Sequence, residues 1–393
     1  MHITNAPTGW RSSPPYEQSY TIVQGTLPGR AVRWVANRVP ATLVSAMRTL
    51  ALSLASLVIL PGRVAPGTAD AAPTSRIARG RLPIARSATR VAPPTLTETI
   101  RARLDSLQAQ SSFYAKQLST GAEVDVRADV PMNTASVIKI PVMILAFRDV
   151  DAGRLDLDQR YVIRAEDLRR GSGLLQTFAP GLNPTLRDVV TQMIITSDNT
   201  ATDIMIAKVG RDRVNRMLDS LGYRQTRLNA TTGELFRQVW VSADPKYASM
   251  SDRDVFTRGF PNDSGADRRN VAFVADSSKW LGKTTAREIA RLLEQLQRGE
   301  LASQRSTQQM LRILRQQFYA SRLPQRIRSR AAIAHKTGDW PPLLGNDVGI
   351  IYAPSGPIVA AVFTNMNRGD FFDLEATEGR IAEDLLNAWG GAR

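Results

Sequence analysis

The stretch Ser136-Val137-Ile138-Lys139 opens an apolar segment with helical spacing. Positions i and i+3 share one helix face, so we expect Lys139 one turn from Ser136 and within reach of its hydroxyl. Its apolar neighbours predict that Lys139 is buried, and burial lowers the pKa of a lysine until the neutral amine can serve as a base. The stretch therefore predicts an activated serine nucleophile. Taken alone, it more often indicates a capping serine beside a lysine that reaches solvent.

A second motif, Ser197-Asp198-Asn199, precedes a helix predicted to begin near Thr200. In a catalytic interpretation, Ser197 relays a proton to a leaving nitrogen and Asn199 offers its amide to a substrate. Ser, Asp and Asn are also the residues that most often cap helices, so the motif alone indicates a helix start.

A third motif, Lys336-Thr337-Gly338, follows the apolar run Ala331-Ala332-Ile333-Ala334 and is predicted to lie on a strand. Gly338 would let a ligand approach the backbone, while Lys336 supplies a positive field and Thr337 a hydroxyl for a carboxylate. By itself the motif is an ordinary strand end.

The composition limits the chemistry. The chain has 393 residues with 2 His and 0 Cys, which excludes a disulfide framework, a thiolate nucleophile and a Cys-ligated metal site. A serine triad would need His2 or His335, so a lysine base fits better. Lys and Arg number 51 against 36 acidic residues, but no block of five like charges occurs. This pattern favours a weakly basic solvated surface over nucleic-acid binding.

Strand patterns lie near both ends of the ordered part of the chain, and helical patterns lie between them. Helices are predicted over 97–107 and 375–389, and strands over 112–115, 122–126, 348–352 and 358–363. The helical segments between them are 137–147, 186–195, 201–221 and 285–296. These patterns predict an α+β fold, in which both chain ends build one antiparallel sheet covered by helices, with an all-helical lobe inserted over about 136–325.

The first 95 residues have a different composition. Residues 47–71 combine a basic start, an eleven-residue apolar run and an Ala-Asp-Ala cleavage site, which are typical of a secretory signal peptide. The run is shorter than the ~20 residues of a membrane span, although an uncleaved anchor or a buried helix is the alternative. We expect residues 1–46 to be a start-site artefact or a disordered extension, 72–95 a linker and 96–393 the catalytic domain. The mature protein is expected to be periplasmic or secreted, without a stable membrane span.

Together and in this order, the three motifs resemble the signature of class A β-lactamases and penicillin-binding proteins. The similarity extends to Gly171-Ser172-Gly173-Leu174-Leu175, to 185–188, to 194–202 and to 348–351, and it covers residues of about 96–393. The resemblance implies an antiparallel sheet beside a helical lobe, with the site in the cleft between them. It implies neither a metal nor an organic cofactor.

The resemblance also implies roles for the motif residues. Ser136 would form the acyl-enzyme, and Lys139 would be its general base or proton shuttle. Ser197 would relay a proton, while Asn199 contacts the substrate amide. Lys336 and Thr337 of the third motif would bind the substrate carboxylate. The backbone N–H groups of Ser136 and Asp339 would form the oxyanion hole.

The chain departs from the family where the acyl-enzyme is hydrolysed. Class A enzymes activate water with a glutamate in a Glu-x-x-Leu-Asn pattern, and this pattern is absent from residues 226–236. Glu234 lies 35 residues after Asn199, close to the family spacing, and is our candidate deacylation base. Counting without gaps from residues 226–228 puts Thr232 at that position instead. The alternative for Glu234 is an exposed loop carboxylate.

Three further departures concern the cleft. An extra segment of about 238–283 carries six aromatic residues and is expected to pack beside the cleft mouth, where it would change which substrates fit. Asp339 would repel an anionic substrate unless it is paired or turned away. No clear counterpart of the family's substrate-binding arginine is visible, and Arg326, Arg328 and Arg330 are the nearby possibilities.

The sequence thus predicts a serine hydrolase of the class A β-lactamase type, which opens β-lactam amide bonds through an acyl-enzyme on Ser136. One alternative is a DD-peptidase-like or other acyl-serine hydrolase with little β-lactamase activity. A non-enzymatic alternative is a penicillin-binding sensor module. The expected partner is a small β-lactam or peptidoglycan-like substrate, with no nucleic acid, and a monomer is favoured.

Overall fold

The computed structural model describes residues 21–27, 30–36 and 94–391 of the chain. They belong to two units, Met1–Ser87 and Ala88–Arg393. In the first unit, β1 (Thr21–Leu27) pairs antiparallel with β2 (Arg30–Ala36), so these residues of the predicted extension form regular structure. The predicted signal peptide and most of the predicted linker lie outside the described residues.

The second unit contains a five-stranded antiparallel sheet of order β4-β3-β10-β9-β8. Its strands are β3 (Gln110–Gln117), β4 (Glu123–Val126), β8 (Ala332–Trp340), β9 (Leu344–Ala353) and β10 (Gly356–Asn365). β3 from one end of the domain pairs with β10 from the other, with Phe113 opposite Val362. The prediction of one sheet built from both chain ends is therefore confirmed.

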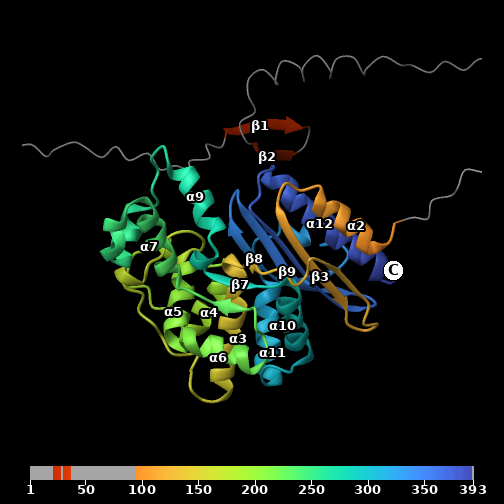
Figure 1. Cartoon of the computed structure of the whole chain (residues 1–393), viewed down its shortest axis with the longest axis horizontal. Coiled ribbons are helices and arrows are strands. Elements are labelled where there is room, and N and C mark those ends of the chain that lie inside the picture. The colour runs from red at the N-terminus through yellow and green to blue at the C-terminus, as the bar shows by residue number, and fades with distance from the viewer. Residues whose placement is uncertain (1–20, 28–29, 37–93, 392–393) are drawn as a thin grey trace, which may run out of the picture. The chain divides into compact units, whose positions relative to one another are not determined.

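Helices cover both faces of this sheet (Figure 1). On one face lie α2 (Leu96–Asp105) and α12 (Phe371–Trp389), whose buried Ile100 and Leu385 share a core with Phe113 of the sheet. On the other face lie α10 (Ala286–Arg298), which contacts β3, β9 and β10, and α11 (Gln304–Arg315), which contacts β8. The central strands are consequently buried on both sides.

The inserted lobe is helical, as predicted. It contains α3 (Lys139–Asp151), α4 (Leu186–Ile195), α5 (Asn199–Val209), α6 (Arg211–Ser220) and the short turns η1 (Ala135–Ile138), η2 (Ala165–Asp167) and η3 (Leu175–Thr177). The turn η6 (Leu323–Arg326) instead packs against α12. One prediction is wrong in detail, because 201–221 forms two helices rather than one. The break lies at Gly210, whose φ of 84° a continuous right-handed helix does not allow.

The extra segment folds as a helical layer of the lobe. It comprises the second half of α7 (Thr232–Ala243), then η4 (Pro245–Ser249), α8 (Asp252–Arg258), α9 (Ala266–Ala275) and η5 (Ser277–Lys279). It ends in β7 (Gly282–Thr284), which pairs with β5 (Met132–Asn133) and β6 (Arg227–Leu228). This small sheet ties the extra segment to the chain just before Ser136.

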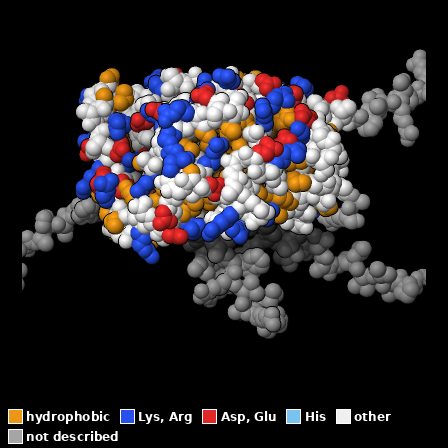
Figure 2. Space-filling model, turned by 90° about the horizontal axis from the view of Figure 1, so that it is seen from below, with side chains coloured by type: hydrophobic (Ala, Val, Ile, Leu, Met, Phe, Trp, Pro, Cys, Tyr) orange, Lys and Arg blue, Asp and Glu red, His pale blue; other side chains and the backbone are white. Residues whose placement is uncertain are grey.

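The surface matches the composition. Figure 2 shows a face on which Lys and Arg side chains are spread among acidic and apolar ones rather than gathered in one block. Among the described residues, no helix combines the length and the apolar character needed to cross a bilayer.

Candidate active site

Ser136 lies in η1, wedged between the helical lobe and strand β8. The preceding Ala135 has a φ of 39°, a left-handed conformation that turns the chain sharply into η1. β8 passes so close that a Cβ on Gly338 would collide with the carbonyl oxygen of Thr134. Glycine is therefore required at position 338 for strand and nucleophile to meet. Ser136 retains 9 % exposure at the wall of a cavity.

Lys139 is fully buried at the start of α3, as its apolar neighbours predicted. Its Nζ donates to the carbonyl oxygen of Ser197 at 2.7 Å and to Oδ1 of Asn199 at 2.8 Å, and it lies 3.3 Å from the Ser197 hydroxyl. Burial, and next the charge of Lys336, hold the pKa of Lys139 well below its ordinary value. A neutral amine has two N–H groups for these two acceptors, and its lone pair stays free to accept a hydroxyl proton.

The second motif holds its residues in a strained turn between α4 and α5. Ser197 has a φ of 55°, which is costly for a residue with a Cβ and is typical of functional sites. Asp198 caps α5 by accepting from the N–H of Ala201 at 2.8 Å, so the capping interpretation also holds. Asn199 donates its amide to the Arg170 carbonyl at 2.8 Å while it accepts from Lys139, which fixes its orientation.

Lys336 approaches the same hydroxyl from β8. Its Nζ donates to Oγ of Ser197 at 3.0 Å and to the Thr337 carbonyl at 2.7 Å. Burial lowers the pKa of Lys336 to about 7, although Asp339 and Asp347 oppose that effect. The Ser197 hydroxyl thus lies between two buried amines. A proton can pass through it with little movement of heavy atoms.

Thr337 has the property expected of a ligand-binding hydroxyl. Its Oγ1 is buried and has no hydrogen-bond partner within the described part of the chain. Buried polar atoms are almost always satisfied, so a hydroxyl that is left open is suited to an oxygen of a ligand.

Asp339 is paired rather than free, because Arg322 binds its carboxylate. Arg322 also lies 3.3 Å from Glu375 and lines the cavity, and sequence reasoning did not single it out. The three arginines suggested by the sequence point elsewhere, since Arg326 pairs with Glu383, Arg328 bonds the Ala320 carbonyl and Arg330 bonds Asn387.

The structure does not bring Glu234 to the other site residues. Its carboxylate accepts from the N–H of Thr231 at 2.7 Å and pairs with Arg211 at 2.9 Å, and its side chain is 42 % exposed. It is a capping-box residue of α7 and does not line the cavity. Thr232, the other position that we considered, does line the cavity.

Thr232 contacts a carboxylate, that of Asp203, which already accepts several hydrogen bonds. Asp203 accepts from the N–H and the hydroxyl of Thr232 at 2.7 and 2.8 Å, and from the N–H of Gly233 at 2.9 Å. Its second oxygen also pairs with Arg169 at 2.7 Å. Four donors saturate this carboxylate, so it is poorly placed to take a proton from water.

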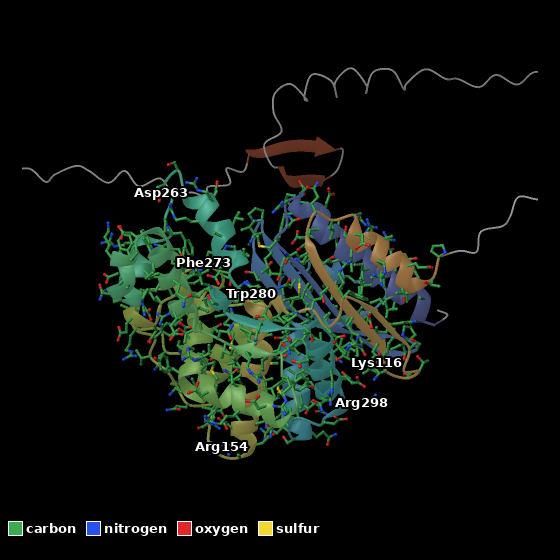
Figure 3. The ribbon with its side chains drawn as sticks, in the orientation of Figure 1. Lys116, Arg154, Asp263, Phe273, Trp280 and Arg298 are labelled. Atoms are coloured by element: carbon green, nitrogen blue, oxygen red, sulfur yellow. The ribbon has the colours of Figure 1, made fainter. Side chains whose placement is uncertain are left out.

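The cavity itself has a volume of about 640 Å³ and joins Ser136 to the extra segment. Its polar walls include Ser136, Asn199, Thr232 and Asp339. Its aromatic lining residues are Phe236, Phe260, Phe273, Trp280 and Trp340. Figure 3 shows Phe273 and Trp280 on the inner side of the extra segment, between α9 and the strands, whereas Asp263 lies at its outer tip.

Comparison with known proteins agrees with this geometry. The sequence model of the "Beta-lactamase enzyme family" matches residues 95–389. The beta-lactamase VEB-1 of Pseudomonas aeruginosa is 22 % identical over 276 residues, which cover 67 % of this chain and 81 % of that protein. A beta-lactamase structure from Sphaerobacter thermophilus is 29 % identical with a TM-score of 0.60, covering 75 % of this chain and 96 % of that one. The structure of PBP-A, at 24 % identity and a TM-score of 0.57, covers 75 % and 95 % and shares the fold.

Proposed function

We propose that this chain, which belongs to the Beta-lactamase enzyme family, is a serine enzyme with fast acylation and slow deacylation. β-Lactams would acylate Ser136 rapidly, and the enzyme would release the acyl group slowly. This behaviour is that of a DD-peptidase-like acyl-serine hydrolase rather than of an efficient β-lactamase. One observation carries the proposal. The amines of Lys139 and Lys336 meet at the hydroxyl of Ser197, whereas neither position considered for the deacylating base offers a free acid at the site. Position 232 holds a threonine, and the carboxylate of Glu234 is half-exposed and paired with Arg211.

The proposed acylation uses the hydrogen bonds that join Lys139 and Lys336 to Ser197. Neutral Lys139 accepts the Ser136 proton, directly or through Ser197, as the serine oxygen attacks the amide carbonyl. The backbone N–H groups of Ser136 and Asp339 would stabilise the oxyanion. The Ser197 hydroxyl then passes a proton to the leaving nitrogen, because it lies within 3.3 Å of Lys139 and 3.0 Å of Lys336. The open hydroxyl of Thr337, beside Lys336, would hold the substrate carboxylate.

An efficient class A β-lactamase is the second candidate function. It is favoured by the family match and by relatives that are themselves named beta-lactamases. It requires a base for the hydrolytic water other than Glu234. Lys139, whose pKa burial lowers, follows Ser136 by three residues and is one group of that kind.

Mixing the purified protein with nitrocefin tests both candidates. Intact mass follows the acyl adduct, and absorbance follows turnover. We expect one persistent adduct per chain, lost in Ser136→Ala, with turnover far slower than acylation. Rapid turnover without a lasting adduct would establish the efficient β-lactamase, and loss of that turnover in Glu234→Gln would restore Glu234 as the base. A protein that forms no adduct would be neither of the two candidate enzymes. An adduct that is never released, whichever substrate formed it, would identify a sensor module.

We further propose that the enzyme is exported, to the periplasm or beyond, after cleavage of the signal peptide at residues 47–71. The basic, apolar and Ala-Asp-Ala parts of that segment support this proposal. N-terminal sequencing of the exported protein is expected to give a terminus just after Ala71. A mature terminus before Met47 would contradict it.

A further inference from the structure

Two phenylalanines of the extra segment join a phenylalanine of α7 and a tryptophan of β8 in one wall of the cavity that Ser136 lines. The aromatic wall is defined as Phe236, Phe260, Phe273 and Trp340. Its rings form a continuous chain: Phe236 meets Phe260 edge-on at 5.3 Å and Trp340 at 6.4 Å, and Trp340 stacks on Phe273 at 5.8 Å. All four residues line the same cavity as Ser136.

The aromatic wall is held in a fixed arrangement. The indole N–H of Trp340 donates to Oδ1 of Asn270 on α9 at 2.7 Å, which joins β8 to the extra segment. Phe236 and Phe273 are almost fully buried, so their rings cannot turn away from the cavity. A preorganised apolar surface binds a rigid apolar group without first having to order itself.

The proposed function already places the carboxylate end of the substrate away from the aromatic wall. The carbonyl carbon must reach Ser136, and the carboxylate is proposed to lie at Thr337 and Lys336. The part of the substrate on the acyl side of the carbonyl must then extend past Asn199 and Thr232. Phe236 follows Thr232 by one turn of α7, so that path leads to the aromatic wall.

Two basic residues that line the cavity are partnered within the protein. Arg269 pairs with Asp263, and Lys279 lies 3.4 Å from Asp276 while its amine sits over the Phe273 ring at 5.7 Å. These two charges are therefore poorly available to a charged group of the substrate. The ring faces, by contrast, are available to an apolar group. The chemistry of this part of the cavity favours an aromatic ligand group.

We propose that the aromatic wall binds an aryl group on the acyl side of the substrate, so that the enzyme prefers acyl donors with an aromatic acyl side chain. This inference rests on the proposed function, because it concerns the donor that acylates Ser136. Aromatic rings bind one another in stacked and edge-on arrangements that add to plain burial, and the wall already presents both arrangements.

The test compares acylation by three penicillins that share one nucleus. They are 6-aminopenicillanic acid without a side chain, its phenylacetyl derivative, and a derivative with an alkanoyl chain of the same carbon number. Second-order rate constants are measured by competition with a fluorescent penicillin. We expect the phenylacetyl compound to react at least about tenfold faster than the unsubstituted nucleus, and faster than the alkanoyl compound.

Substitutions then locate the preference. Phe260→Ala is expected to reduce the phenylacetyl advantage several-fold, and because Phe260 is 43 % exposed its loss leaves the core intact. Phe236→Leu, which keeps an apolar side chain in the core, should also reduce the phenylacetyl advantage. An unchanged melting temperature would show that this variant is still folded. Phe178→Ala is the matched control, since Phe178 is 50 % exposed and lies outside the cavity lining.

The outcomes separate this inference from the proposed function. Equal rates for the three penicillins, or a phenylacetyl advantage that both wall variants leave intact, would overturn the aromatic wall as a binding surface while the acyl adduct still forms. An alkanoyl compound as fast as the aryl compound would overturn the aromatic preference. A protein that none of the three acylates would overturn the proposed function, and this inference with it.

Discussion

The cavity has an acylation side and a deacylation side, and the two are built differently. On the acylation side, the buried amines of Lys139 and Lys336 meet at the hydroxyl of Ser197, and burial lowers the pKa of both. On the deacylation side, the hydroxyl of Thr232 donates to the carboxylate of Asp203, which is already saturated. Groups that can move protons are concentrated on one side only. Forming and releasing the acyl bond are therefore separable in this molecule.

The largest expected effect comes from removing the amine on the acylation side. Lys139→Met keeps a long apolar side chain in the buried space but deletes the proposed base. We expect the acylation rate with nitrocefin to fall by about a thousandfold, within the range that general-base catalysis contributes. Lys208→Met on the exposed end of α5 is the control. A folded Lys139→Met protein that is acylated at the normal rate would remove Lys139 from the mechanism.

The second prediction gives the deacylation side the carboxylate that it lacks. Thr232→Glu would place an acid against Asp203, and two close carboxylates cannot both ionise, so the substitution is combined with Asp203→Asn. We expect the rate of acyl-adduct loss to rise by about a hundredfold while the acylation rate changes little. Asp203→Asn alone should not accelerate release. If the combined variant folds and its adduct is as stable as before, the missing carboxylate is not what limits release.

The third prediction uses the pKa values of the acylation side. Acylation requires neutral Lys139, so the rate rises as pH passes the lowered pKa of that amine. It also requires charged Lys336, so the rate falls again above the pKa of about 7. The pH profile of the second-order acylation constant should thus be bell-shaped, because that constant reports the free enzyme.

Asp339→Asn sharpens this prediction. The carboxylate of Asp339 raises the pKa of Lys336, and its removal lowers that pKa further. The alkaline limb is expected to move to lower pH, with a loss of roughly threefold at pH 8 relative to the parent enzyme. An alkaline limb that does not move would assign it to a group other than Lys336.

The acylation side could be predicted from the sequence because its chemistry is encoded in short motifs. The spacing of Ser136 and Lys139 and the apolar neighbours of Lys139 were enough to predict a buried amine at the start of a helix. The sheet built from both chain ends followed from strand patterns that local periodicity reveals. By contrast, the helix predicted over 201–221 is interrupted, because Gly210 adopts a positive φ. The periodicity of apolar residues does not reveal that conformation.

The deacylation side and the cavity wall depend on contacts between distant segments. Arg322 meets Asp339 only because the chain folds back at η6, which packs against α12 and β9, and nothing local to Arg322 distinguishes it from Arg326. Trp340 and Phe273 belong to different layers, so the sequence could predict that the extra segment is aromatic and not which rings stack. The glutamate spacing was similarly ambiguous, since one shift of alignment exchanges Glu234 for Thr232.

The smallest expected effect concerns Glu234, whose substitution tests whether the deacylation side truly lacks an acid. Glu234→Ala removes a capping-box partner and an ion pair with Arg211, both half-exposed, and should cost about 0.5–1 kcal/mol of unfolding free energy in urea. Acylation and release rates should stay within twofold of the parent enzyme, because this carboxylate faces solvent rather than the cavity. Glu166→Ala, at another exposed carboxylate, controls for charge. If release slows strongly in Glu234→Ala alone, the loop must move to bring this acid to the acyl-enzyme, and the two sides of the cavity are less different than their static contacts imply.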